Sequence, residues 1–143
     1  SAIRDASAEP LLREICARIA ADEIRHYKLF RVHLDRYQAQ ERLPLWRRIL
    51  VLVARVRETG DDELPYAYWA GNGSEGVYDR RTSARAYASR AYRLYQPAHI
   101  ERAAAMGFKA VGLKPDGFAC RVAARLARSA VSLASRRLAA AGV

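Results

Sequence analysis

The longest regular pattern in this sequence is residues 10–37, PLLREICARIAADEIRHYKLFRVHLDRY. At about 100° per residue, its apolar side chains fall within roughly 60° of one direction around an α-helix. These apolar positions are Leu12, Ile15, Cys16, Ile19, Tyr27, Phe30, Leu34 and Tyr37. The arginines of the stretch point in other directions. The pattern predicts one long amphipathic helix whose apolar face packs against other helices.

Two polar residues, Glu23 and His26, lie on this predicted apolar face. An ionised carboxylate on a buried face costs free energy unless another group pairs with it. Three interpretations remain open: a local contact between the two side chains at i,i+3 spacing, a hydrogen-bonded core histidine beside an incidental glutamate, or a Glu-x-x-His pair of metal ligands in a helix bundle. The last is favoured by the spacing, which sets a carboxylate oxygen and an imidazole nitrogen one turn apart.

Length and charge limit the possibilities further. A chain of 143 residues suffices for one domain with a core. The net charge of +10 comes mostly from arginine. Residues 1–41 carry seven basic and seven acidic residues, whereas residues 42–143 carry eighteen basic and eight acidic ones. The positive charge therefore belongs to the second, longer part of the chain.

The cysteines and the hydropathy pattern indicate an intracellular setting. Cys16 and Cys120 are far apart and form no C-x-x-C motif, so neither a disulfide framework nor a zinc knuckle is predicted. No signal peptide and no run of about 18 apolar residues for a transmembrane segment is visible. We expect a cytoplasmic protein.

The remaining sequence reads as further helices. Ser7 is the expected N-cap of the long helix, which then runs to about Gln40. We expect a second helix over residues 45–59 that ends at Gly60, a loop or a broken helical turn over 61–76, and helices over 77–95 and 98–108. A connector over 106–115 then leads to Asp116, the expected N-cap of a last helix over 117–141. With no strand pattern, the predicted fold class is all-α.

The run Ile19-Ala-Ala-Asp22-Glu23-Ile-Arg25-His26-Tyr27, followed by Phe30, resembles the last bundle helix of the ferritin-like superfamily. This superfamily includes rubrerythrins, acyl-carrier-protein desaturases, ribonucleotide reductase small subunits and uncharacterised bacterial ferritin-like domains. The resemblance covers residues 1–37. It implies that residues 1–41 are the C-terminal part of a ferritin-like bundle. Residues 42–143 are more weakly similar to the helical C-terminal extension of some bacterial members, which would pack on that bundle.

The resemblance also implies a metal site. In the family, one Glu from each of two helices and one Glu-x-x-His from each of two others hold a di-iron centre. Glu23 would then be a bridging carboxylate ligand and His26 a nitrogen ligand, while Asp22 would orient a ligand histidine from a neighbouring helix in the second shell. Tyr27 and Phe30 would be cavity walls or packing residues. Carboxylate and imidazole ligands suit iron or manganese, so the implied activity is oxidoreductase chemistry of the ferroxidase, oxygenase, desaturase or peroxide-reducing type.

The sequence supplies only half of such a site. It has no second Glu-x-x-His, and His99 and Glu101 stand at i,i+2, where helical side chains diverge. The sequence begins with Ser1 rather than Met, nine residues before the long helix. We therefore expect the other ligands to come from N-terminal helices that precede this sequence or from a second subunit.

A different function class is predicted by the basic part of the chain. Arg121, Arg125 and Arg128 share one face of the last predicted helix. Such a face binds anions or is simply solvated. The alternative function is a non-catalytic helical interaction module whose Arg- and Tyr-rich tail binds an acidic protein partner, nucleic acid or a membrane surface. No recognised nucleic-acid motif is present, so no specific nucleic-acid partner is expected.

Overall fold

The computed structural model describes residues 2–58, 62–72 and 76–140. Every regular element in this part of the chain is an α-helix, as predicted. The helices are α1 (Ala2–Ala6), α2 (Pro10–Glu41), α3 (Leu45–Glu58), α4 (Glu63–Gly71), α5 (Arg80–Leu94), α6 (Pro97–Ala110) and α7 (Phe118–Ala140).

The predicted long helix is present as α2 and begins and ends through local hydrogen bonds. Its N-cap is Glu9 rather than Ser7: the Glu9 carboxylate accepts hydrogen bonds from the backbone N–H groups of Leu11, at 3.0 Å, and Leu12. The Ser7 hydroxyl instead accepts one from the N–H of Glu9, at 3.1 Å. At the other end, Arg42 adopts a left-handed conformation with φ of 47°, and its N–H bonds the carbonyl of Gln38.

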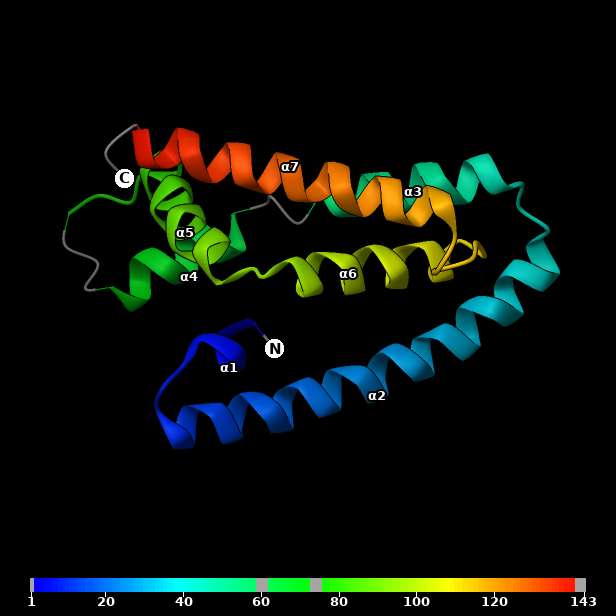
Figure 1. Ribbon diagram of the computed structural model, residues 1–143, viewed down its shortest axis with the longest axis horizontal. Coiled ribbons are helices and arrows are strands. Elements are labelled where there is room, and N and C mark those ends of the chain that lie inside the picture. Colours follow the sequence, from blue (N-terminus) through cyan, green and yellow to red (C-terminus); the bar gives the residue numbers. More distant parts are fainter. Residues whose placement is uncertain (1, 59–61, 73–75, 141–143) are drawn as a thin grey trace.

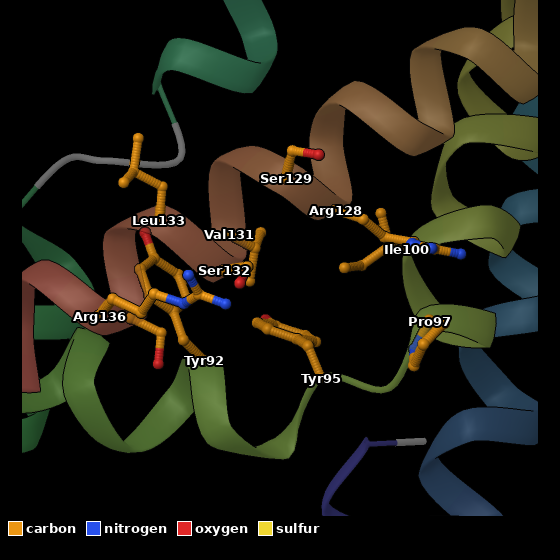
Figure 2. Close-up of a pocket in the computed structure, with 11 residues that line it drawn as sticks. Tyr92, Tyr95, Pro97, Ile100, Arg128, Ser129, Val131, Ser132, Leu133 and Arg136 are labelled. Carbon is orange, nitrogen blue, oxygen red and sulfur yellow. The ribbon is translucent and has the colours of Figure 1, made fainter.

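The helices form two unequal parts (Figure 1). In one part α7 packs along α6 and across α5, and α5 packs on α4. Its buried residues are Pro65, Ser83, Ser89, Val111, Cys120 and Ala124. In the other part α2 runs along the opposite side of α6, with the short α1 folded against it. A groove of about 660 Å³ lies between α7 and the junction of α5 with α6 (Figure 2).

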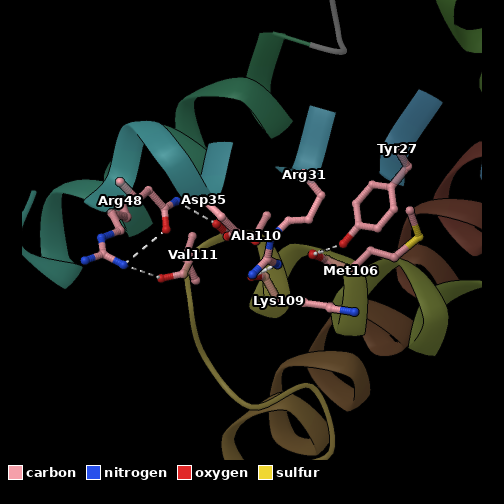
Figure 3. Close-up of polar contacts among 9 residues, drawn as sticks. Tyr27, Arg31, Asp35, Arg48, Met106, Lys109, Ala110 and Val111 are labelled. Carbon is pink, nitrogen blue, oxygen red and sulfur yellow. Dashed lines mark hydrogen bonds and ion pairs between the residues drawn. The ribbon is translucent and has the colours of Figure 1, made fainter. Parts of the chain in front are cut away.

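The C-terminal half of α2 is attached to the last turn of α6 by polar contacts (Figure 3). The Tyr27 hydroxyl donates to the carbonyl of Met106 at 3.5 Å, Gln38 Nε2 donates to the carbonyl of Ala110 at 2.8 Å, and Arg31 donates to the carbonyl of Lys109. The last carbonyls of a helix have no partner within the helix and carry partial negative charge. Backbone N–H groups of residues 111–113 already bond three of these carbonyls, so the α2 donors Arg31 and Gln38 supplement the C-terminal cap of α6.

Arg48 connects three elements at this point (Figure 3). Its guanidinium donates to the carbonyl of Leu43 at 2.8 Å, to Gln38 Oε1 at 3.2 Å and to the carbonyl of Val111 at 3.4 Å. These contacts join α2, the start of α3 and the end of α6. Gly112 follows with φ of +86°, where an added Cβ would lie 3.0 Å from Arg48 Nη1.

Residues 61–76, predicted to be a loop or a broken helical turn, include the helix α4, which is longer than a single turn. Pro65 lies in the first turn of α4, where a proline is compatible with an α-helix because the first N–H groups have no intrahelical partner. The ring of Tyr78 stacks edge-on against Tyr66 at 5.4 Å and lies 5.5 Å from Trp69. Desolvation among these rings, with a hydrogen bond to Asp62, raises the pKa of Tyr78 to about 12. Aromatic packing thus stabilises α4. The glycines near this helix made it hard to predict from the sequence.

The other boundaries shift by a few residues. The helix predicted from residue 77 begins at Arg80, because the Asp79 carboxylate accepts a hydrogen bond from the N–H of Thr82 at 2.7 Å and acts as N-cap. A hydrogen bond with the Thr82 side chain, and then this backbone bond, hold the pKa of Asp79 below its ordinary value. The connector begins at Val111 rather than Met106, since α6 continues to Ala110. The predicted stop at Gly60 lies outside the described residues.

Candidate functional site

A groove of about 810 Å³ runs between α2 on one side and α1 and α6 on the other. The α6 wall presents His99, Arg102, Ala103 and Met106, which share one face of that helix at i, i+3, i+4 and i+7. The α2 wall presents the apolar face predicted from the sequence, including Cys16, Ile19, Tyr27 and Phe30. The groove is therefore formed where α2 and α6 do not pack closely against each other.

Glu23 and His26 both line this groove from α2. The prediction that this face of α2 is buried is wrong for the 143-residue chain by itself. Glu23 and His26 are both solvent-exposed. Among the described residues neither side chain has a hydrogen bond or an ion pair. The local contact between Glu23 and His26 and the satisfied core histidine, two of the interpretations left open by the sequence, are therefore not observed.

The apolar residues around the pair are exposed as well. Ile19 is 54% exposed and Phe30 is 69% exposed. The same face continues through further exposed side chains, namely Leu12, Ile15, Leu34 and Tyr37. Contiguous apolar surface of this kind marks a site of contact with another chain, segment or ligand.

The residues of this chain fit part of a metal centre and not a whole one. Within residues 2–58, 62–72 and 76–140, no group of three or more His, Cys, Asp or Glu side chains is placed to hold a metal ion. Glu23 and His26 provide one carboxylate and one imidazole one turn apart on the groove wall. A di-metal centre of the implied kind needs four carboxylates and two histidines. We therefore derive no catalytic step from these residues.

His99 also lines the groove and carries a nitrogen that could bind a metal, but it is already hydrogen-bonded. Its Nε2 lies 2.7 Å from Asp5 Oδ2, and its Nδ1 accepts a hydrogen bond from the N–H of Gln96 at 3.1 Å. Because Nδ1 is an acceptor, Nε2 carries the proton and donates to Asp5. Hydrogen bonds from Arg4 and then from His99 lower the pKa of Asp5 to about 2. This pair joins α1 to the start of α6.

The pairing of His99 with Asp5 was not predicted from the sequence. One local signal was available, since Gln96, Pro97 and His99 form a capping box with proline in the first turn of α6. The capping box sets the orientation of the His99 ring. It does not predict that Asp5 is the partner of His99, because Asp5 is distant in the sequence.

Asp22 is not among the residues that line the groove. It is exposed and forms an ion pair with Arg25 on the same helix. That Asp22 orients a ligand histidine of another helix stays a prediction, because its partner among the described residues is Arg25.

The predicted basic face of α7 is present and exposed. Arg121, Arg125 and Arg128 line a small groove of about 330 Å³ beside Pro115 and Cys120. Arg121 Nη1 donates to the backbone carbonyl of Asp116 at 3.0 Å, and Arg128 is paired with Glu101 at 3.3 Å. Two of the three guanidinium groups are therefore engaged within the chain.

Comparisons of this chain with protein-family models, with curated proteins and with solved structures found no match. Among the described residues, none of the helices has the length and apolar character needed to cross a membrane.

Proposed function

We propose that this chain is the Glu-x-x-His part of a metal-binding helical oxidoreductase of the ferritin-like type. Glu23 and His26 are ligands of one or both metals of an iron or manganese pair. The remaining ligands come from helices that are not among these 143 residues, either preceding helices of the same protein or helices of a second subunit. Those helices cover the apolar face of α2.

The observation that carries this proposal is the state of Glu23 and His26 in the groove. Both are unpartnered within the described residues, and both lie among exposed apolar side chains of α2. When other helices cover that face, a carboxylate left without a partner costs several kcal/mol. A metal cation bound by Glu23 and His26 supplies the compensating charge, and additional carboxylates from the covering helices complete the ligand set.

A second candidate is the helical interaction module with a basic surface. The observation in its favour is Arg125, which is exposed on α7 and has no hydrogen bond or ion pair among the described residues. An acidic protein partner would neutralise this surface. This function needs neither Glu23 nor His26, so the two candidates are separable by substitution.

The test is metal analysis of the protein expressed from its complete gene. We expect bound iron or manganese in the unsubstituted protein and its loss in the double variant Glu23→Ala/His26→Ala. The matched control is Glu14→Ala/His33→Ala, which removes the same residue types from exposed positions of α2 outside the groove lining. Equal metal content in the two double variants would rule out the ligand assignment.

A further inference from the structure

The groove between α7 and the α5–α6 junction is separate from the α2 groove and differs from it in chemistry. Its volume is about 660 Å³, within the range of about 300–1,000 Å³ that is usual for small-molecule sites. One wall is α7, and the other is built from Tyr92, Tyr95, Pro97 and Ile100. The groove contains no residue of the proposed metal site.

The α7 wall presents a polar face to this groove. Its members stand at i, i+1, i+4, i+7 and i+8, a spacing that places them on one side of a helix. They are Arg128, Ser129, Ser132, Ser135 and Arg136. Three hydroxyl groups are therefore arranged between two guanidinium groups, separated along the helix axis by about 12 Å at 1.5 Å per residue.

The groove is positively charged, and at one end this charge has no acidic partner among the described residues. Among the described residues that line the groove, none is acidic. Arg128 is paired with Glu101 at 3.3 Å, whereas Arg136 has no hydrogen bond or ion pair in the described part of the chain. A cleft lined by one sign of charge attracts ligands of the opposite sign. The uncompensated positive charge of the groove therefore lies at the Arg136 end.

The facing wall is aromatic. The rings of Tyr92 and Tyr95 lie 6.5 Å apart at an angle of 42°. In Figure 2, Arg136 lies beside Tyr92 at one end of the groove, Tyr95 and Ser132 lie in the middle, and Ile100 is near Arg128 at the other end. A ligand whose anionic group contacts Arg136 would therefore meet hydroxyl groups and an aromatic surface further along the groove.

We propose that this groove binds a small organic phosphate that carries an aromatic ring. The phosphate is bound by the Arg136 guanidinium with the hydroxyls of Ser132 and Ser135, since arginine matches the geometry of phosphate oxygens. The ring packs against Tyr95 and the apolar side chains of Ile100 and Val131. The proposal is independent of the metal site and of Glu23 and His26.

Isothermal titration calorimetry of the protein with adenosine 5′-monophosphate tests this proposal, with adenosine and inorganic phosphate as separate titrants. We expect the nucleotide to bind more tightly than either part. We expect Arg136→Gln to weaken nucleotide binding by about tenfold or more, the effect of losing a charged hydrogen-bond donor. The control Arg137→Gln removes the same charge from the next residue, which does not line the groove, and leaves binding within about twofold.

Three outcomes would overturn the proposal. The first is no measurable binding of the nucleotide by the unsubstituted protein. The second is an equal loss of binding in Arg136→Gln and Arg137→Gln, which would show attraction to the basic helix in general. The third is binding of inorganic phosphate as tight as binding of the nucleotide, because the aromatic wall would then contribute nothing. Circular dichroism of both variants verifies that α7 remains folded.

Discussion

Asp5 and His99 illustrate how single side chains connect parts of this molecule that are far apart in the sequence. The pKa of Asp5 is about 2, below its ordinary value of 3.8, because Arg4 and His99 hydrogen-bond its ionised form. A carboxyl whose pKa is lowered by folding stabilises the folded state above its unfolded pKa. This contribution is lost as the pH falls through the folded value.

We therefore predict a pH-dependent effect of Asp5→Asn. Near neutral pH the variant has a lower free energy of unfolding than the unsubstituted 143-residue chain. The difference shrinks between about pH 4 and pH 2, because the unsubstituted chain then loses the contribution of the ionised carboxylate. Urea unfolding at a series of pH values measures this. A difference that is constant from pH 7 to pH 2 would show that Asp5 is not held ionised by its neighbours.

Gly112, in the turn after α6, has a φ of +86°, in the left-handed region that favours glycine. Gly112→Ala places a Cβ in a left-handed backbone conformation, 3.0 Å from Arg48 Nη1, and should lower the free energy of unfolding by about 1–2 kcal/mol. Gly71→Ala is the control, since nothing lies within 4 Å of its added Cβ, and it should be neutral or slightly stabilising. Chemical denaturation of both variants measures the contrast. Equal stabilities would show that the turn after α6 does not require glycine.

Helices α2 and α7 differ in the solvent exposure of their apolar residues. Phe30 of α2 is exposed in the groove, whereas Ala124 of α7 is buried. In the 143-residue chain, Phe30→Gln should change the free energy of unfolding by no more than about 0.5 kcal/mol, as for a surface residue. Ala124→Leu adds volume to a packed site and should cost about 1–3 kcal/mol. A large loss of stability in Phe30→Gln would mean that this chain buries the α2 face by itself.

The elements themselves were largely predictable from the sequence, because the helical period of apolar residues is local information. Residues 10–41 form one helix as their pattern predicts. The helix over Glu63–Gly71 was missed because Pro65 and the nearby glycines are read as helix breakers, while the packing of Tyr66 and Trp69 on Tyr78 depends on tertiary contact.

The arrangement of the helices was not predictable in the same way. The attachment of α2 to α6 uses Arg31, Gln38 and Arg48 as donors to backbone carbonyls. Any residue offers a backbone carbonyl, so the sequence contains no signal for these partners. The Glu-x-x-His motif was recognisable from residue types and spacing alone. Its solvent exposure depends on which helices surround α2, and one helix pattern does not contain that information.

At the scale of the whole molecule, the two parts of the chain have different roles. The segment from α4 to α7 contains the buried residues and the basic surface. Helix α2 presents an apolar face with Glu23 and His26 to an open groove. Our account is that α2 is one wall of a metal site whose other walls are supplied by further helices. Its central claim is that Glu23 and His26 bind metal together.

The most direct test of that claim is an anomalous-difference map, recorded at the absorption edge of the bound metal, from crystals of the protein expressed from its complete gene. We predict a peak within bonding distance of both the Glu23 carboxylate and an imidazole nitrogen of His26. We also expect the helices that supply the remaining ligands to cover the apolar face of α2. A metal peak that contacts neither residue, with Glu23 and His26 still open to solvent, would contradict the account.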